Sequence, residues 1–362
     1  MGLLLTLLLF SCSTPSPKGA LQPIQTARIH EEGNHVLHGL PISIQLLSDS
    51  LAGIHFDATR YTVYNYYTGR MVSSLLLDSS VLPDLLLQAR AYYPHDYQLM
   101  SMQEGREIGV PVLSVDGVFY SKEKQQYFLF ISAAFAVDTF IDVRGVKEPA
   151  TATHHVCYVA VLNRHFAITS RYTILRGENV APAFLFGGLL QEDRLLVPNI
   201  ELEHIDTPGF GMLCSVALEQ DRGRISSIPV PFDYRTRLQR KNHIFDQVSF
   251  ADVDGNSYYV SDGCRILHCR DSVFRSIYAM DTNEHVYNLY YNHTRNLLYI
   301  NTRFGEQALG SKVFTLDTAG KSLSLIDSSH TERSVDFIND SLILSIHKTP
   351  DEEHYAFSLY NY

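Results

Sequence analysis

The sequence predicts an all-β fold of repeated short strands, and three observations lead to it. Long helical patterns are scarce, and most of the chain consists of short alternating or apolar runs divided by turn residues. Tyr and Phe, which favour strands, are abundant at 22 and 19 residues, while Trp is absent. A unit of strand, Asp/Asn/Gly turn and aromatic strand recurs along the chain.

The chain opens with an apolar leader. Residues 1–10 are mostly Leu, and the run ends at Ser11 and Cys12. About ten apolar residues suit an export signal, whereas a membrane-spanning helix needs about 20. The segment therefore resembles a bacterial lipoprotein signal peptide over residues 1–11, after which Cys12 would carry the lipid and become the new N-terminus. No Lys or Arg precedes the run, which is unusual for such a signal.

A short tether follows Cys12. Residues 13–19 are rich in Ser, Thr and Pro, a composition typical of linkers and not of a buried core. We expect residues 12–23 to hold the lipidated Cys and a flexible tether, and residues 24–362 to form one domain. Lipid on Cys12 would anchor the protein to a membrane without threading it. The expected location is the bacterial cell envelope, on the periplasmic face of the outer membrane in preference to the cell surface.

Six copies of the repeating unit predict the architecture of the domain. Their turns stand about 40 to 77 residues apart, and four-stranded sheets at this period are typical of radial β-propellers. The sequence therefore predicts a β-propeller of six blades, each a four-stranded antiparallel sheet, with five or seven blades as alternatives. The copies cover residues 54–64, 113–131, 189–197, 248–260, 289–300 and 335–346. In the second copy, Asp116 and Gly117 are expected to form the turn.

Three further features fit into this plan. Residues 81–90 predict a short helix on a connecting loop, with a Pro near its first position. Residues 156–161 and 165–168 form an extra strand pair, which we place in the outer half of the second blade. Residues 25–30 are expected to pair with residues 355–360, because a borrowed early strand removes the exposed edge that an open ring leaves.

The fourth copy carries a more specific pattern. It has an Asp-x-x-Gly-Asn turn at residues 252–256, a Tyr-Val-Ser-Asp strand at residues 259–262, and Arg-Ile-Leu at residues 265–267. This pattern resembles an NHL-type propeller blade, and the whole arrangement is similar to the TolB-like six-bladed propeller lipoproteins of Bacteroidota. The close match covers one blade, so the resemblance implies the fold and leaves the function open, since propellers host unrelated activities.

Composition bears on the partners and on the cysteines. The net charge is −10, which argues against nucleic acid because phosphate binding needs a basic face. Cys264 and Cys269 lie five positions apart in a predicted strand, too far from each other for a disulfide. Their spacing also differs from the Cys-x-x-Cys of a zinc site. We expect them, with Cys157 and Cys214, to be free, buried thiols.

Two metal-like patterns have simpler explanations. Residues 252–257 are rich in Asp, as in a calcium-binding EF-hand loop. That loop needs Gly at position 6 and Glu at position 12, whereas here Gly falls at position 4 and position 12 is Gly263. A tight hairpin turn with positive φ at Gly255 and Asn256 is therefore favoured. His154 and His155 are adjacent, and neighbours on a strand point to opposite faces, so they could share a metal only across a bend. We predict no metal and no cofactor.

One basic cluster stands out in this acidic chain. Arg235, Arg237, Arg240 and Lys241 lie within a segment that is expected to join two blades at one end of the ring. Such a cluster can bind an anionic sugar, a lipid headgroup or the acidic patch of a partner, and the alternative is a solvated loop. These four residues are the candidate anion- or partner-binding site.

The sequence contains no familiar catalytic signature. It has no Gly-x-Ser-x-Gly elbow, P-loop, His-Glu-x-x-His or dinucleotide-binding pattern. We therefore expect an envelope-anchored binding or scaffolding module whose partner is an envelope protein or a glycan. The alternative is a glycan-acting enzyme with its site in the funnel of the propeller. An enzyme should bring carboxylates or histidines together there, whereas a scaffold should present a flat or apolar rim.

Overall fold

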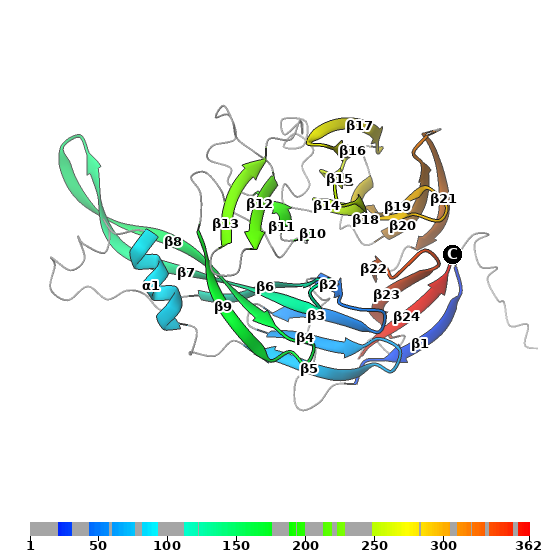
Figure 1. The fold of residues 1–362 in the computed structure, drawn as a ribbon, viewed down its shortest axis with the longest axis horizontal. Helices are drawn as coiled ribbons and strands as arrows, with labels where there is room; N and C mark the ends of the chain where they lie inside the picture. Colours follow the sequence, from blue (N-terminus) through cyan, green and yellow to red (C-terminus); the bar gives the residue numbers. More distant parts are fainter. Residues whose placement is uncertain are drawn as a thin grey trace, which may run out of the picture.

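A computed structural model shows six four-stranded blades arranged in a ring, a six-bladed β-propeller (Figure 1). The innermost strands surround the centre, and the first five blades continue outward in chain order, whereas the outermost strand of the sixth comes from the start of the chain. The structure describes residues 21–30, 43–57, 60–76, 82–92, 112–121, 123–175, 188–192, 194–199, 213–218, 223–228, 248–281, 284–304, 310–319, 321–329, 333–349 and 354–362.

The first three blades come from the N-terminal two thirds of the chain. Blade 1 comprises β2 (Ser43–Leu46), β3 (Leu51–Asp57), β4 (Arg60–Asn65) and β5 (Arg70–Leu76). Blade 2 comprises β6 (Val112–Ser121), β7 (Gln126–Val143), β8 (Val146–Leu162) and β9 (Ile168–Leu175). Blade 3 comprises β10 (Leu189–Gln191), β11 (Arg194–Pro198), β12 (Leu213–Leu218) and β13 (Gly223–Ile228).

The last three blades complete the ring, and the sixth uses both ends of the chain. Blade 4 comprises β14 (Ser249–Asp254), β15 (Ser257–Ser261), β16 (Arg265–Arg270) and β17 (Val273–Ala279). Blade 5 comprises β18 (Glu284–Asn292), β19 (Leu297–Phe304), β20 (Gly310–Asp317) and β21 (Ser322–Ser329). Blade 6 comprises β22 (Arg333–Phe337), β23 (Leu342–Lys348), β24 (Tyr355–Asn361) and, as its outermost strand, β1 (Pro23–Arg28). The predicted pairing of the two chain ends is thereby confirmed.

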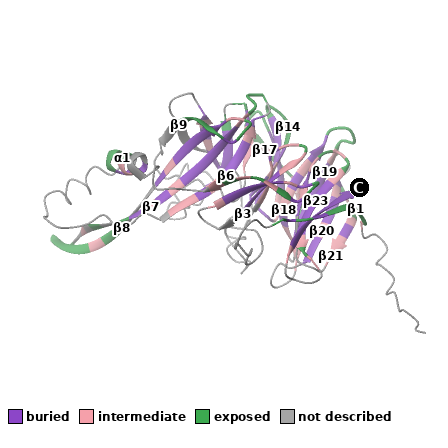
Figure 2. Cartoon of the chain, turned by 90° about the horizontal axis from the view of Figure 1, so that it is seen from below, coloured by how far each residue is buried: buried purple, intermediate pink, exposed green. Residues whose placement is uncertain are grey.

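The core is divided among the gaps between blades. The buried apolar residues form six clusters, and each cluster joins two neighbouring blades. One of them joins blade 6 to blade 1, where Ile54 of β3 packs with Ile346 of β23 and Phe357 of β24. Figure 2 shows this burial along the strand interiors. Six blades with six filled gaps make a closed ring.

Two sequence expectations need correction. Asp116 and Gly117 do not form a turn, because they lie inside β6 at a β-bulge that leaves Asp116 out of register. The copy at residues 54–64 covers the second and third strands of blade 1, so the innermost strand, β2, was missed. The predicted four-stranded blades are all present, and blades 2 and 3 also meet at their outer edges, where β9 and β13 form a short parallel contact through Ile174 and Gly223.

The predicted extra strand pair and helix are present. β8 and β9 form the outer half of blade 2, although residues 165–167 lie in the turn before β9. The helix α1 (Leu82–Tyr92) lies between blades 1 and 2 in the chain. No helix in the described part of the chain is long and apolar enough to cross a membrane.

Candidate functional site

The two ends of the ring differ in how much chain they carry. Four antiparallel strands return the chain to the end at which it entered a blade, so all innermost strands begin at one end. We call this the loop end, and we call the opposite one the turn end. Between the described strands, the connections at the turn end are no longer than residues 163–167. The connections at the loop end include residues 77–111, 176–188, 199–212 and 229–248.

Among the described residues, the longest feature of the loop end is a hairpin arm, residues 136–153 of β7 and β8. β6 stops pairing with β7 at Ala134, but β7 and β8 continue as a two-stranded ribbon to the pair Val143 and Val146. Figures 1 and 2 show this arm extending beyond the ring. At about 3.3 Å per residue, the β7 half of the ribbon, residues 136–143, reaches roughly 26 Å past the blade.

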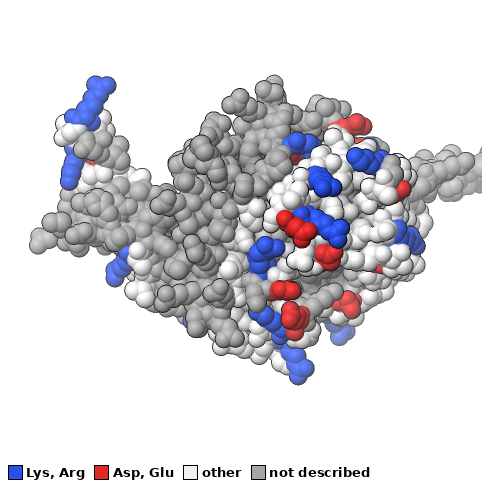
Figure 3. All heavy atoms as spheres, turned by 45° about the horizontal axis from the view of Figure 1, so that its top comes forward, with Lys and Arg blue, Asp and Glu red and all other residues white. Residues whose placement is uncertain are grey.

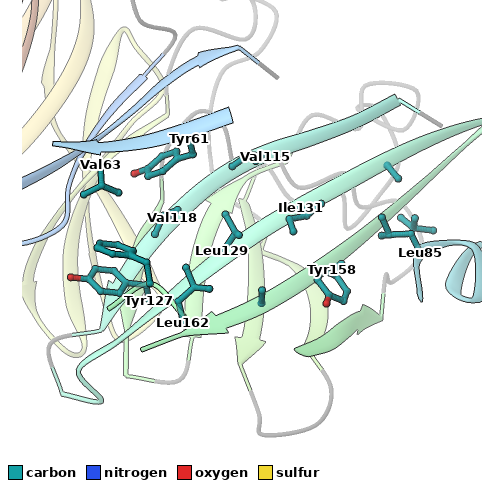
Figure 4. Packing of buried hydrophobic residues seen from close by; sticks show 14 of the residues in the cluster. Tyr61, Val63, Leu85, Val115, Val118, Tyr127, Leu129, Ile131, Tyr158 and Leu162 are labelled. Carbon is teal, nitrogen blue, oxygen red and sulfur yellow. The ribbon is translucent and has the colours of Figure 1, made fainter. Parts of the chain in front are cut away.

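The base of the arm is held by α1. Leu85 and Ala89 of the helix are buried in the same cluster as Phe135, Val156 and Tyr158 of β7 and β8. Figure 4 shows Leu85 on the helix next to the strand that carries Tyr158. The helix therefore covers the apolar face of the ribbon where it leaves the blade, which fixes the direction of the arm.

The tip of the arm is a two-residue turn. Arg144 and Gly145 have φ values of 54° and 85°, the left-handed values that a tight turn between twisted strands requires. Val143 and Val146, the closing pair, are 39% and 61% exposed. Lys and Arg atoms stand at the end of the arm in Figure 3. The tip is thus a tight, partly apolar turn that is exposed to solvent.

A second feature of the loop end is a pair of cation–aromatic contacts in blade 5. The guanidinium carbon of Arg303, on β19, lies 3.8 Å from the ring centre of Tyr287, on the innermost strand β18. The ammonium nitrogen of Lys312, on β20, lies 4.8 Å from the ring centre of Phe304. Lys312 is also bound to Glu284 at the start of β18. All five side chains are half-buried.

Local backbone geometry positions both aromatic rings. A bulge in β18 between Val286 and Asn288 takes Tyr287 out of the regular ladder with β19. Phe304 lies directly over Gly310, where an added Cβ would come within 2.4 Å of the ring. The two aromatic rings therefore have fixed positions at the mouth of the ring.

The turn between β15 and β16 adjoins this cluster. The N–H of Val286 donates to the carbonyl of Gly263 at 2.8 Å, which ties blade 5 to this turn of blade 4. Asp262 is buried, and its Oδ1 accepts the N–H groups of Cys264 and Arg265 at 2.9 and 2.7 Å. Its Oδ2 lies 3.5 Å from Arg265 Nε. The Asp and Arg of the NHL-like pattern thus shape a turn at the loop end.

Carboxylates on the innermost strands are used for contacts within and between blades. Gln191 of blade 3 donates to Asp252 of blade 4 at 2.9 Å, and Asn288 of blade 5 donates to Asp336 of blade 6 at 2.7 Å. Burial raises the pKa of Asp336 to about 6, although Phe337, Asn288 and the backbone of Leu46 in blade 1 partly oppose the shift. Within the described residues, no three His, Cys, Asp or Glu side chains gather as a metal site would require.

The bulged Asp116 forms a polar cluster inside blade 2. Its Oδ1 lies 2.5 Å from Ser114 Oγ and 2.9 Å from Ser132 Oγ, and the two hydroxyls are 2.7 Å apart. Burial raises the pKa of Asp116 to about 6, although the hydroxyls partly oppose the shift. Burial also raises the pKa of the nearby Cys157 thiol well above its usual value, which is the opposite of what a nucleophilic cysteine needs.

The metal-like patterns and cysteines can be followed into the structure. Residues 255–256 form the predicted hairpin turn, but neither Gly255 nor Asn256 has a positive φ, because a bulge between Asp252 and Asp254 supplies the twist instead. His154 and His155 are neighbours on β8, paired with β7. None of these four described cysteines forms a disulfide, as expected, although only two of them are fully buried. These are Cys214 and Cys269, whereas Cys157 and Cys264 are half-buried.

The remaining predicted site residues lie outside the described residues. These are Cys12, Arg235, Arg237, Arg240 and Lys241. The residues that flank the basic segment, Ile228 and Val248, lie at the end of β13 and just before β14, so the segment starts and finishes at the loop end. The cluster of Tyr287, Arg303 and Lys312 was missed because cross-strand contacts need the strand register, which the sequence does not supply.

Comparisons with known proteins add little to these observations. No protein-family model matches the sequence, and no curated protein matches it. A chain from a solved structure titled "Crystal Structure of Mitotic Checkpoint Complex" is 11% identical, with 99% of each chain covered and a TM-score of 0.45. A likeness this weak carries no argument about function.

Proposed function

We propose that this protein is a binding or scaffolding module that recognises an anionic partner at the loop end of its ring. The observation that carries this proposal is the asymmetry between the two ends. All long connections, the arm and the cation–aromatic cluster lie at the loop end, and binding residues concentrate on long loops held by a rigid scaffold. Arg235, Arg237, Arg240 and Lys241 belong to a segment that starts and finishes at the same end.

We also propose that Cys12 carries a lipid that anchors the protein in the bacterial envelope. Leu21, the first described residue, packs in the cluster of blades 5 and 6 near Tyr362. The arm and the C-terminus lie at opposite ends of the molecule in Figures 1 and 2. A tether over residues 13–20 spans about 30 Å at most. It would hold blades 5 and 6 near the membrane and leave the arm pointing away from it.

The blade 4 pattern supports a relationship to the TolB-like and NHL-like propeller lipoproteins of Bacteroidota. Its residues have identifiable roles, since Asp252 links two blades and Asp262 shapes a turn at the loop end. Those roles are structural, so they are consistent with such a relationship and carry no information on the ligand.

A thermal-shift screen tests the binding proposal. The screen uses the full chain and compares two carboxylate polymers, which are oligogalacturonate and poly-L-glutamate, with neutral oligosaccharides. A ligand at 100 times its dissociation constant stabilises by about 2.7 kcal/mol. We expect the acidic polymers alone to stabilise the protein, and neutralising the four basic residues with Gln to weaken that effect. Arg270→Gln with Lys321→Gln, at the turn end, is the matched control. Equal loss in the control would refute a loop-end site.

Metabolic labelling with a radioactive fatty acid tests the anchor. The wild-type chain and Cys157→Ser should incorporate label, whereas Cys12→Ser should not. Unlabelled wild type, or label that persists in Cys12→Ser, would contradict the anchor without affecting the binding proposal.

A further inference from the structure

We infer that two copies of this chain associate through their arms, with the open edge of β7 in one copy paired to the open edge of β7 in the other. β6 covers this edge only as far as Ala134, and beyond that point no described strand pairs with it. An unpaired strand edge presents backbone N–H and C=O groups that another strand can bind. The inference goes beyond the proposed function, because it does not depend on the ligand.

The turn at the tip of the arm determines which backbone groups face the open edge. Val143 and Val146 close a two-residue turn, which makes them a hydrogen-bonded pair. From there to the blade the register of β7 with β8 has no shift, so bonded and non-bonded pairs alternate regularly. Residues 136, 138, 140 and 142 are therefore the positions of β7 whose N–H and C=O groups point away from β8.

The opposite edge of the arm, on β8, is protected by a proline. Pro149 comes three positions after Val146, so by the same alternation its backbone nitrogen points away from β7. It has no N–H to offer there, and the exposed residues Lys147 and Glu148 precede it. Proline and charged residues are common means of keeping an edge strand from pairing. Residues 136–143 of β7 include no proline, so only the β7 edge of the arm is left able to pair.

The charges of the arm favour a second copy in an antiparallel arrangement. Asp138 is exposed near the base of the arm, and Arg144 is exposed at its tip. Antiparallel pairing about a two-fold axis at position 141 places Asp138 of each copy opposite Arg144 of the other, so the contact occurs twice. A parallel arrangement in register would instead place Asp138 against Asp138. The arm is therefore complementary to itself when it runs in the opposite direction.

The neighbouring registers are less favourable. An axis at position 140 would place Asp138 against Asp142 of the second copy, and an axis at position 142 would place the two Asp142 residues against each other. An axis at position 139 would bring Arg144 opposite Ala134, where β6 already pairs with β7. With the axis at position 141, the turn of the second copy lies beside positions 137 and 138. The length of the open edge thus agrees with the register that the charges favour.

The expected dimer is small in contact area but useful to a binding module. The paired edges comprise about seven residues from each copy, so association should depend on the protein concentration. The arm extends from the loop end of each ring, so pairing of two arms joins two loop ends in one assembly. A polymeric ligand could then engage both loop ends at once, which raises the overall affinity without any new contact.

Sedimentation velocity of the full chain over a range of concentrations tests the inference. We expect wild type to dimerise, and Asp138→Arg or Arg144→Asp alone to weaken dimerisation about tenfold or more, because two ion pairs become two like-charge contacts. The double variant Asp138→Arg with Arg144→Asp should recover the dimer, which a mere loss of structure could not do. Arg270→Asp, at the turn end, is the matched control and should dimerise as wild type does. Circular dichroism shows whether each variant remains folded.

A cysteine at the proposed axis tests the register. Position 141 faces itself as a non-hydrogen-bonded pair, with about 4.5 Å between the Cα atoms, which is within the reach of a disulfide. Ile141→Cys should therefore give a disulfide-linked dimer under mild oxidation. Lys147→Cys, on β8 and away from the paired edge, should give no more linked dimer than wild type with its own cysteines.

Four results would overturn the inference. Wild type could remain a monomer at every concentration, or it could form a dimer that no charge variant weakens. The double variant could fail to recover a dimer that both folded single variants lose. Ile141→Cys and Lys147→Cys could also link to the same extent. None of these results would alter the thermal shifts with anionic polymers, so the proposed function is tested separately.

Discussion

Pro23, in the first strand of the chain, pairs with Tyr360, two residues before the C-terminus, and this contact belongs to the ladder that closes the ring. Through that ladder, the outermost strand of blade 6 comes from the opposite end of the chain from the other three. The cluster between blades 6 and 1 includes Ile29, which directly follows this strand. Stability of the whole ring should therefore depend on a few residues near the N-terminus.

Substitution in β1 tests this dependence. Ala27 is buried on β1, while Ile24 on the same strand is 57% exposed. We expect Ala27→Asp to lower the free energy of unfolding by about 2 to 4 kcal/mol, because it buries a charge in the closing blade. Ile24→Asp should change it by less than about 1 kcal/mol. Urea unfolding followed by circular dichroism measures both, and equal effects would contradict a closing role for β1.

A second prediction concerns the contact between blades 1 and 2. Tyr61 donates to Gln45 Oε1 at 2.9 Å, and the same oxygen accepts the N–H of Val118 in blade 2 at 2.9 Å. Tyr61 reaches that position across Gly53, where a Cβ would lie 1.8 Å from the tyrosine oxygen. We expect Gly53→Ala to cost about 2 kcal/mol or more, since the ring has to move.

The matched control for this prediction is Gly255→Ala. Its nearest neighbour, Glu192 Oε1, is 3.9 Å from the added Cβ, and Gly255 has no positive φ. Its unfolding midpoint should stay close to that of wild type. If both variants had the unfolding midpoint of wild type, this result would contradict the close approach of Tyr61 to Gly53.

A third prediction follows from Asp116. Its folded pKa of about 6 lies above the value near 4 of an unfolded chain. Between these values the folded state keeps a proton that the unfolded state has lost. The contribution of Asp116 to stability is therefore full below about pH 4 and is lost as the pH rises through about 6.

Asp116→Asn isolates that effect. Above pH 6 the variant should be more stable than wild type by about 2 to 3 kcal/mol, because it never has to bury a charge. Below pH 4 the two proteins should converge. Unfolding curves from pH 4 to pH 8 give this difference directly. A variant that is less stable than wild type at pH 8 would show that the ionised carboxylate is stabilising.

A fourth prediction concerns the turn of blade 4. Asp262→Ala removes the acceptor of two backbone N–H groups and the partner of Arg265, so we expect a loss of about 2 kcal/mol. Asp262→Asn keeps an oxygen acceptor, so its loss in the free energy of unfolding should be less than half of the loss in Asp262→Ala. Thermal unfolding of the two variants compares them. Equal losses would assign the effect to the charge alone.

The sequence predicted the repeating architecture because the alternation and the turn residues are local signals. The closing strand followed from a general requirement of rings, that no edge remain open. The bulge at Asp116 was mistaken for a turn because Asp-Gly is a strong local turn signal. In β6 the pairing with β7 continues on both sides of it and overrides that preference.

The candidate site was only partly accessible from the sequence. The four basic residues at 235–241 lie within seven positions of one another, so the sequence alone reveals them, and the described residues on either side place both ends of their segment at the loop end. Tyr287, Arg303 and Lys312 come from three different strands, and their meeting depends on register and on a bulge. The length of the arm was hidden in the same way, because the sequence of β7 and β8 does not show where β6 stops pairing.

Hydrogen exchange of the full chain, with and without a saturating carboxylate polymer, tests whether the loop end is the binding surface. We expect slower exchange at the loop end of blade 5, in residues 284–287 and 302–304. The turn-end hairpins at residues 255–256 and 293–296 should exchange as in the free protein. Protection confined to those hairpins, with no change at the start of β18 or the end of β19, would contradict a working surface at the loop end.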